Sequence, residues 1–356
     1  SEVHGVMTSA ACQIIHPYAL EYATAFPVIT EITGRVEHVE FCGVGGRADL
    51  LLVAPATANT IGKIAMGIDD TPVTTFATTA LGSGKPVVVV PAMHEAMYRH
   101  PAVIKNLETL KAIGIIIIDP RIEEGKAKIA DSRSIISEVE RLLGPRDLDG
   151  KKILVTSGST AERVDPIRIL TNRSSGKTGV EIAKEAHRRG AYVTIVHRFP
   201  QALPFREIYA ESAQEMHDAV LSELRKDYDA LISAAAIADY TLDASRVKIK
   251  SGQDLVLKLK PTKKLIENAR SSYPDLKIIG FKAETFVSEE ELAKRAIESM
   301  NKWDLDLVVA NDVGLGGIGT EENAVQIIGR DGYKVEARGS KSLIARSIVD
   351  ALVAIL

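Results

Sequence analysis

The chain has 356 residues, of which 46% are hydrophobic, and its 44 Lys and Arg residues against 47 Asp and Glu residues give a formal net charge of −3. At roughly 150 residues per domain this length predicts two domains with separate cores, and the balanced charge argues against the clustered cations of a nucleic-acid-binding protein. The two cysteines, Cys12 and Cys42, exclude a disulfide scaffold or a four-thiolate metal site within one chain. The longest aliphatic runs, such as 87–90 and 115–118, are far shorter than the ~20 residues of a membrane-spanning helix, so we expect a soluble, cytoplasmic protein with no membrane partner.

Short aliphatic segments alternate with longer amphipathic segments along the whole chain. This pattern predicts an α/β fold in which parallel sheets are covered by helices on both faces, that is, a doubly wound architecture. In the first half we expect strands at residues 3–7, 50–53, 87–90 and 115–118. The first expected strand starts so early that the strand and phosphate-binding turn that often open such a domain do not fit before it. Either that opening strand and loop are missing from a shortened chain, or the domain binds its ligand with other loops.

The second half repeats the pattern. We expect strands at residues 153–156, 192–196, 230–233, 277–281 and 307–310, with a helix at 179–189. The Gly- and Pro-containing segment 144–150 separates the two halves, so the predicted domains are residues 1–147 and 148–356. Residues 247–250 and 255–259 alternate apolar residues with Lys around Ser251-Gly252, which predicts an exposed β-hairpin inserted in the second domain.

Two segments of the first half carry polar residues directly after expected strands, where open α/β sheets bind ligands. In the first, residues 55–60, Thr57, Asn59 and Thr60 could hydrogen-bond a heterocycle, or the segment could simply be a turn followed by a helix N-cap, a position that Thr and Asn both favour. The second, residues 91–98, includes Met93 and His94. Upstream of both, His38 has apolar and carboxylate neighbours and could act as a base near neutral pH, or could be an ordinary histidine without a catalytic role.

In the second half, residues 165–179 place Ser, Gly and Lys at the start of a helix, which is a phosphate-binding chemistry. The segment is not a P-loop, because Thr171 stands where that motif requires Gly and no strand precedes it. Residues 314–319 satisfy G-x-G-x-x-G, but a strand-like segment follows instead of a helix. We therefore interpret residues 314–319 as a glycine loop, and we disfavour the NAD-dependent dehydrogenase that the motif alone would suggest.

Taken together and in this order, these motifs resemble a family of bifunctional coenzyme A biosynthesis enzymes, which join phosphopantothenate:cysteine ligase to phosphopantothenoylcysteine decarboxylase. The resemblance covers nearly the whole chain. In the first half it rests on His38, residues 55–60, 91–93 and 97–98, and in the second half on residues 165–166, 172, 174–177, 235–240, 248, 280–281, 284–285 and 310–313.

The resemblance implies two Rossmann-like domains, a flavodoxin-like decarboxylase domain and a ligase domain with a β-hairpin flap. For the ligase it implies that CTP, as co-substrate with Mg²⁺, converts phosphopantothenate to an acyl-nucleotide, from which cysteine displaces CMP. Asn172 would orient the acyl-nucleotide, and Lys248, with Lys177 and Mg²⁺, would neutralise the charge on the phosphates. The metal ligands are not assigned. The implied substrate residues are Ser174, Ser175, Gly176 and Lys177, and the implied nucleotide residues are Ala235, Ala236, Ile237, Ala238, Asp239, Lys248, Phe281, Asn311, Asp312 and Val313.

For the decarboxylase the resemblance implies FMN as the electron acceptor and His38 as the base. Ala56, Thr57, Asn59 and Thr75 would contact the flavin, and Met93 and His94 the substrate. Many relatives have Asn where this chain has His94. Many bacterial relatives carry a Cys in a substrate flap that here, at residues 120–130, contains none, so the final proton donor is unassigned, with Lys126 one candidate. The resemblance also implies homo-oligomers built from ligase dimers and decarboxylase trimers, up to a dodecamer. One alternative keeps the ligase and treats the first half as a non-catalytic oligomerisation scaffold.

Overall fold

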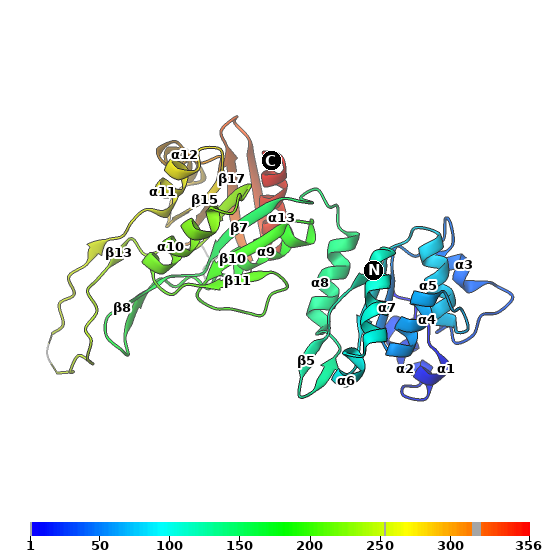
Figure 1. The fold of residues 1–356 in the computed structure, drawn as a ribbon. Helices are drawn as coiled ribbons and strands as arrows, with labels where there is room; N and C mark the ends of the chain where they lie inside the picture. The colour runs from blue at the N-terminus through cyan, green and yellow to red at the C-terminus, as the bar shows by residue number, and fades with distance from the viewer. Residues whose placement is uncertain (1, 253, 315–321) are drawn as a thin grey trace. The chain divides into compact units, whose positions relative to one another are not determined.

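The computed structural model describes residues 2–252, 254–314 and 322–356, and the chain divides into two compact units, Ser1–Leu143 and Gly144–Leu356 (Figure 1). Each unit is described by itself. No helix in these ranges is both long and apolar enough to cross a membrane.

Unit 1 is built on a small parallel sheet. Its strands are β1 (Leu51–Ala56), β2 (Val87–Pro91) and β4 (Ile116–Ile117), in the order β1-β2-β4. Every residue of β2 is buried, as expected for a central parallel strand covered on both faces. The helices of the unit are α1 (Ser9–Cys12), α2 (Pro17–Thr24), α3 (Glu37–Cys42), α4 (Ala58–Met66), α5 (Pro72–Gly82), α6 (Glu95–Tyr98), α7 (Pro101–Ala112) and α8 (Ser132–Leu143).

The strand expected at residues 3–7 is not formed. Val6 makes only an isolated parallel bridge with Ile29, supported by hydrogen bonds from Met7 N to Ile29 O and from Ile29 N to Gly5 O, each 2.9 Å long. The ladder ends there because Thr8 already caps α1. Apolar composition alone therefore overstated the length of this segment's pairing.

A second, antiparallel sheet of unit 1 has the strand order β3-β6-β5. Its strands are β3 (Met93–His94), β5 (Arg121–Glu123) and β6 (Lys126–Lys128). The segment expected to be the substrate flap thus forms the β5–β6 hairpin, and this hairpin pairs with the strand that carries Met93 and His94.

Unit 2 is an eight-stranded sheet with the order β11-β10-β7-β12-β15-β16-β17-β18. The first six strands are parallel and the last two antiparallel. Their bounds are β7 (Lys152–Ser157), β10 (Tyr192–His197), β11 (Arg206–Tyr209), β12 (Ala230–Ser233), β15 (Lys277–Glu284), β16 (Leu307–Asp312), β17 (Glu322–Gly329) and β18 (Lys334–Ser340).

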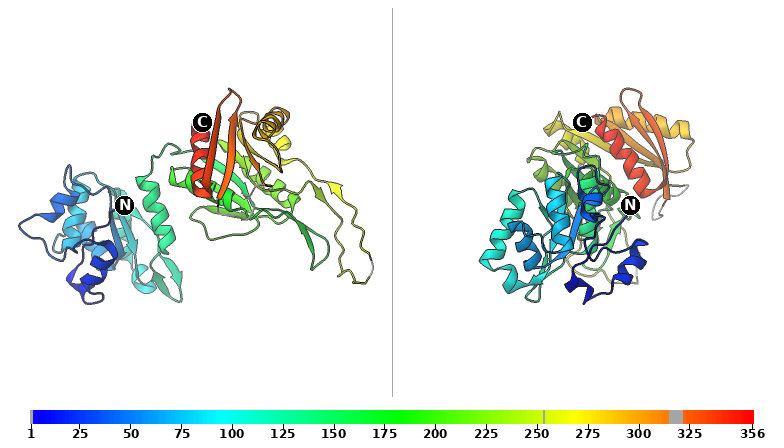
Figure 2. Two further views of the ribbon diagram at one scale, coloured as in Figure 1. Left: turned by 180° about the vertical axis from the view of Figure 1, so that it is seen from behind. Right: turned by 90° about the vertical axis from the view of Figure 1, so that its right-hand side faces the viewer.

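Helices cover both faces of this sheet, as the sequence predicted. On one face α9 (Lys177–Arg188) and α13 (Lys341–Val353) pack together, and Figure 2 shows α13 beside β18. On the other face lie α10 (Ala213–Leu224), α11 (Leu265–Ser272) and α12 (Glu289–Trp303). Strand β7 shows why both faces are buried: Ile153 and Val155 belong to the core under α9 and α13, while Leu154 belongs to the opposite core.

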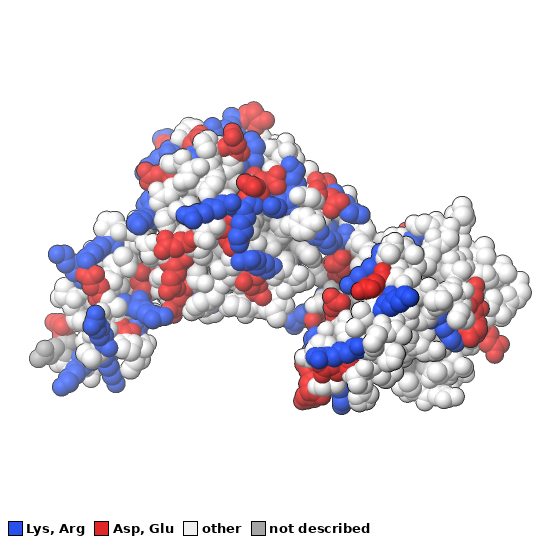
Figure 3. Space-filling view, in the orientation of Figure 1, with Lys and Arg blue, Asp and Glu red and all other residues white. Residues whose placement is uncertain are grey.

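Two short antiparallel pairs project from the carboxyl edge of the unit 2 sheet. The first is the hairpin of β8 (Ala161–Arg163) and β9 (Ile169–Thr171). The second pairs β13 (Tyr240–Thr241) with β14 (Lys260–Pro261). We call the connecting segment 242–259 the arm; it extends away from the sheet in Figure 1, and basic side chains cover much of it in Figure 3.

The hairpin expected at residues 247–250 and 255–259 is wrong in its pairing. No described residue of the arm lies in a strand, and only its base is paired. The reason is that backbone N–H groups of its first branch bond elsewhere: Ser245 N donates to Val164 O over 2.9 Å and Ile249 N to Asp165 Oδ2 over 3.1 Å. These two N–H groups therefore cannot donate hydrogen bonds to residues 255–259, the second branch of the arm.

Candidate active sites

The ligand edge of unit 2 is the carboxyl edge of its parallel strands. The register aligns Ser157 with His197 and Ser233 with both Thr156 and Gly280, so β7, β10 and β12 end side by side, while β15 runs on to Glu284. Ligands of open α/β sheets bind outside this edge.

Helix α9 begins directly against the end of β7. Its N-cap is Gly176, with φ of 77°, whose carbonyl accepts a hydrogen bond from Ser157 Oγ over 2.7 Å. A Cβ at Gly176 would lie 2.9 Å from the Cα and N of Gly158, and a Cβ at Gly179 would lie 2.6 Å from Ser157 Oγ. Both glycines are therefore required for this close approach. It places Ser174, Ser175, Gly176 and Lys177 at the ligand edge, where the helix N-terminus favours an anion.

Asn172 and residues 235–239 meet at the same edge. Asn172 Nδ2 donates to Ala236 O over 3.0 Å, and Ala236 N donates to Gly158 O over 2.7 Å. Thr160, which is fully buried, accepts the N–H of Ala238 on its Oγ1 over 2.9 Å. These contacts join the ends of β7 and β12 to the residue that follows β9.

A hollow of about 210 Å³ opens beside residues 235–239. Its walls combine apolar and aromatic side chains with a few polar groups, which is the composition of small-molecule sites. Five of its residues are predicted nucleotide residues: Ala235, Ile237, Ala238, Asp239 and Phe281.

Seven further residues line the hollow and were not predicted from the sequence. These are Ser233, Thr262, Lys263, Lys264, Leu265, Ile266 and Trp303. Lys264 is the N-cap of α11 and its Nζ hydrogen-bonds the Asp239 carboxylate at the mouth of the hollow. The basic pair before α11 was a visible signal for a ligand site, whereas nothing local to Trp303, at the end of α12, pointed to the hollow.

The remaining predicted ligase residues lie outside this hollow. Asp312 accepts hydrogen bonds from the backbone N–H groups of Phe286, Val287 and Gly314 over 2.8–3.0 Å, and Val313 N donates to Glu284 O over 2.8 Å. Asp312 therefore holds together the loops after β15 and β16, with Asn311 and Val313 beside it. Lys248 lies exposed on the arm.

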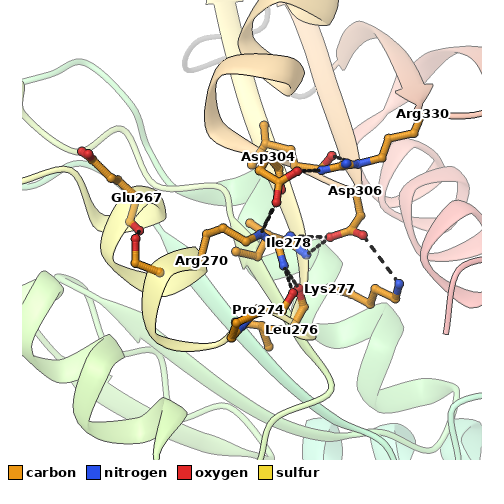
Figure 4. Close-up of polar contacts among 11 residues, drawn as sticks. Glu267, Arg270, Pro274, Leu276, Lys277, Ile278, Asp304, Asp306 and Arg330 are labelled. Carbon is orange, nitrogen blue, oxygen red and sulfur yellow. Dashed lines mark hydrogen bonds and ion pairs between the residues drawn. The ribbon is translucent and has the colours of Figure 1, made fainter.

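A larger hollow, of about 540 Å³, lies at the opposite, amino edge of the unit 2 sheet and is lined by residues that include Lys151, Pro274, Leu276 and Lys277. Its wall is a tied loop: Arg270 Nη1 donates to Pro274 O and Leu276 O over 2.6 and 2.8 Å (Figure 4). Although this hollow is larger, it is at the edge where parallel sheets do not bind substrates. We therefore assign the active site to the smaller hollow.

In unit 1, three of the four predicted flavin residues, Ala56, Thr57 and Asn59, lie where β1 ends and α4 begins. Ala56 is fully buried, and its carbonyl accepts a hydrogen bond from Ala92 N over 3.0 Å, which joins the ends of β1 and β2. Thr57 is the N-cap of α4, and its Oγ1 accepts the N–H of Thr60 over 3.3 Å. The cap interpretation is thus confirmed, and Thr57 and Asn59 remain exposed at the carboxyl edge of the sheet.

His38 lies on α3, which packs against α5, the helix that carries Thr75. Thr75 Oγ1 donates to Thr71 O over 2.9 Å. The Nδ1 atom of His38 is buried and has no hydrogen-bond partner within the described part of the chain. Since buried polar atoms are nearly always paired, this orphaned nitrogen fits a residue that meets a bound ligand. No hydrogen bond or ion pair among residues 2–143 joins it to Asn59 or His94.

The register of the flap brings two predicted residues together. His94 stands directly opposite Lys126 in the antiparallel β3–β6 pair, so their side chains share one face of that sheet. The other flap lysine, Lys128, already pairs with Glu123 and Glu124 over 3.1 and 3.2 Å. No such ion pair of Lys126 occurs in the described residues.

The glycine loop falls largely outside the described residues, since residues 315–321 are not described. The next described element is β17, where a dinucleotide fingerprint would have a helix. In the described ranges no three His, Cys, Asp or Glu side chains are grouped so as to hold a metal ion.

Comparison with known proteins finds the same division of the chain. Residues 1–144 match the family described as Flavoprotein, and residues 148–356 match the DNA/pantothenate metabolism flavoprotein C-terminal domain. The protein named coenzyme A biosynthesis bifunctional protein CoaBC from Thermococcus kodakarensis is 50% identical over 99% of this chain and 88% of its own length. Its namesake from Methanocaldococcus jannaschii is 38% identical over 98% and 86%, respectively.

Solved structures resemble unit 2 in fold. A crystal structure of the C-terminal domain of a CoaBC protein has a TM-score of 0.50 and 30% identity, and covers 59% of this chain and 97% of that chain. The DNA/pantothenate metabolism flavoprotein from Streptococcus pneumoniae has a TM-score of 0.52 and 26% identity, and covers 58% and 100%, respectively.

Proposed function

The chain belongs to the family of coenzyme A biosynthesis bifunctional proteins, and from this membership we propose that it joins 4′-phosphopantothenate to cysteine and then decarboxylates the product to 4′-phosphopantetheine. It is a bifunctional enzyme with a decarboxylase part and a ligase part. We assign decarboxylation to residues 1–147 and ligation to residues 148–356.

One observation carries the ligase assignment: the Asn172 amide, the start of α9 and the hollow beside residues 235–239 are linked by direct contacts at the carboxyl edge of one sheet. Ligation requires that two anions be held together. The hollow, with Phe281 in its wall, would bind the nucleoside of CTP, and the N-terminus of α9 would bind phosphate.

In the reaction, a carboxylate oxygen of phosphopantothenate attacks the α-phosphate of CTP and pyrophosphate leaves. The cysteine amine then attacks the acyl carbon, CMP leaves and the amine loses a proton. Lys248, brought over the site on the arm, would neutralise the charge that develops on the phosphates, and Asn172 would orient the acyl group. Mg²⁺ would be held chiefly by the nucleotide phosphates, as is usual for this ion.

In the decarboxylase part, Ala56, Thr57, Asn59 and Thr75 would hold FMN, which supplies a two-electron acceptor when bound. The orphaned Nδ1 of His38 fits a contact with this ligand or with the substrate. His38 would remove the proton from the reacting cysteinyl group. Met93 and His94 would bind the substrate, and Lys126, opposite His94, would supply the final proton.

The test is a product assay with phosphopantothenate, cysteine, Mg²⁺ and either CTP or ATP, in which CMP or AMP is quantified and the pantothenate product is identified by mass. We expect CMP only when both phosphopantothenate and cysteine are present, and we expect a pantothenate product that has lost CO₂. Asn172→Ala should abolish CMP formation. Absence of nucleoside monophosphate under every condition would overturn the ligase assignment.

A second candidate is a ligase whose first half is only an oligomerisation scaffold, and the absence of Cys from the flap favours it. The same assay decides, because this candidate predicts a product that keeps the cysteine carboxylate. His38→Asn should stop CO₂ release while ligation continues. A matched control is His100→Asn, because His100 caps α7 through its ring nitrogen and Asn is also a good cap.

We further propose homo-oligomers built from ligase dimers and decarboxylase trimers, which a dodecamer would satisfy, and light scattering of the purified protein tests this. Cys12 and Cys42 are both free thiols, as suits the reducing cytoplasm in which we place the reaction.

A further inference from the structure

A single buried carboxylate connects the β8–β9 hairpin to the arm. Asp165 lies in the turn of that hairpin, and its side chain has no exposed surface. Its two oxygens have separate partners. Oδ1 accepts the backbone N–H groups of Ile167 and Arg168, each over 2.8 Å. Oδ2 accepts Arg168 Nη1 over 2.9 Å and the arm's Ile249 N over 3.1 Å.

The arm is therefore held at Ile249 through both its backbone N–H and its backbone carbonyl. While Ile249 N donates to Asp165, Ile249 O accepts Arg168 Nη1 over 3.1 Å. One further bond, from Ser245 N to Val164 O, holds the same branch. Burial raises the pKa of Asp165, but the N–H groups of Ile167 and Ile249 and the charge of Arg168 lower it on balance, so the carboxylate is ionised at neutral pH.

Among the described residues of the arm, one further tie is the ion pair of Asp243 with Lys260 at its base. Val247 and Val256 are 71% and 90% exposed, so apolar burial does not hold the segment. Lys248 precedes the clamped residue, and β9, on the other side of the hairpin, leads directly into Asn172, whose amide is bound to Ala236 O. The hairpin thus connects the position of Lys248 to that of Asn172.

We propose that Asp165 is a positioning residue of the ligase, whose Oδ2 clamps the arm at Ile249 and thereby fixes where the arm carries Lys248. The role of Lys248 rests on the function proposed above, whereas the clamp itself does not. A merely structural turn would need Oδ1 alone, because the two N–H bonds to Oδ1 already form the turn.

This division of oxygens makes Asp165→Asn informative. The amide oxygen can keep the two turn bonds, but the NH₂ group in place of Oδ2 can accept neither the N–H of Ile249 nor that of Arg168. A hydrogen bond to a charged group shifts a two-state equilibrium by roughly 10-fold to 100-fold. Undocking of the arm should increase by about that factor.

The arm contains trypsin sites at Lys248 and Lys250, so its docking can be measured without any activity. In the full-length protein, Asp165→Asn should raise the rate of tryptic cleavage after these lysines by about 10-fold or more. In the activity assay it should lower the kcat of CMP formation by a similar factor and leave the KM for CTP within about threefold of the wild-type value. The matched control is Asp229→Asn, because Asp229 also accepts a backbone N–H, that of Lys152 over 2.8 Å, but at the opposite edge of the sheet.

Unchanged cleavage in the arm of Asp165→Asn would refute the clamp. Faster cleavage with unchanged kcat would refute the positioning of Lys248. If the wild type forms no CMP at all, the proposed function fails, yet the cleavage result still decides the clamp. If Asp165→Asn does not fold, as judged by Trp303 fluorescence, Arg168→Met is the second variant. The Arg168 side chain is 41% exposed and contributes one half of the clamp. Unchanged tryptic cleavage of the arm in Arg168→Met would equally overturn the proposal.

Discussion

Replacing Gly179 by Ala should destabilise unit 2, although Ala is the better helix former. In the interior of a helix this exchange stabilises by about 1 kcal/mol. Here, however, the new Cβ would lie 2.6 Å from Ser157 Oγ and 2.7 Å from Ser157 Cβ, whereas carbon atoms pack best at roughly 3.5–4.0 Å. The Oγ atom is held by its bond to Gly176 O, and the Cβ cannot rotate away. Helix α9 must therefore move off β7.

Overpacking of this kind costs about 1–3 kcal/mol. Since the overlap involves a Cβ, we take the upper value, and subtracting the helix preference leaves a loss of about 2 kcal/mol. For a unit of this size that lowers the melting temperature by roughly 4–8 °C. The displaced helix start should also weaken phosphopantothenate binding.

Trp303 makes the measurement specific, because it is the only tryptophan of the chain and lies in unit 2. Its fluorescence during thermal or urea unfolding reports this unit alone. The control is a double-mutant cycle with Ser157→Gly, which removes both overlapping atoms and leaves Ser157 Cα at 3.2 Å. In that background Gly179→Ala should cost less than about 0.5 kcal/mol. A single variant as stable as the wild type, or additive effects in the cycle, would refute the steric argument.

Three further outcomes are expected. Arg270→Met should lower the stability of unit 2 by about 3 kcal/mol, because it removes the donor to the backbone carbonyls of Asp304, Pro274 and Leu276 and one partner of the Asp306 carboxylate (Figure 4), and a change below about 0.5 kcal/mol in the Trp303 transition would contradict this. Burial raises the pKa of Glu185, but the arginines that end α9 lower it on balance. The contribution of Glu185 to the free energy of unfolding is thus complete above the unfolded pKa of about 4.5 and is lost as the pH falls through the lower folded pKa. Glu185→Gln should therefore make stability depend less on pH in acid, and an unaltered pH dependence would speak against this. Thr57→Ala and Thr71→Ala each remove a helix N-cap, and each should lower the stability of unit 1 by about 1 kcal/mol in unfolding followed by circular dichroism. Only Thr57→Ala should also weaken FMN binding, and equal FMN affinities of the two variants would disprove this.

Local signals identified elements whose physics is local. The short apolar segments at 87–90 and 230–233 were predicted as strands, and every residue of both is buried, as in parallel strands covered on both faces. The cap at Thr57 was likewise visible, since its partner Thr60 is three residues away. The rejection of a P-loop rested on Thr171, where that motif requires Gly, and on the expectation that no strand precedes it; the second expectation is wrong, because the short antiparallel strand β9 ends at Thr171.

The predicted hairpin in the arm failed for a nonlocal reason. Its alternation of Lys and apolar residues is typical of an exposed ladder, but Ile249 N is taken by Asp165, 84 residues earlier in the chain. The segment at residues 3–7 likewise obtained a bridge to Ile29 instead of a strand. In both cases the partners of the backbone N–H groups decided the outcome, and periodicity does not reveal partners.

The candidate ligase site was likewise predicted only in part from the sequence. The sequence alone determined the α/β class, most strands of the two parallel sheets and the motifs that follow them, because side-chain periodicity and turn chemistry act within a few residues. Only the tertiary structure placed Lys263 and Trp303 in the hollow with Phe281, used Asp312 to tie two loops, and attached the arm to Asp165. These contacts join residues far apart in the chain, and the free energy that selects them comes from packing and hydrogen bonds formed only once the sheet has assembled.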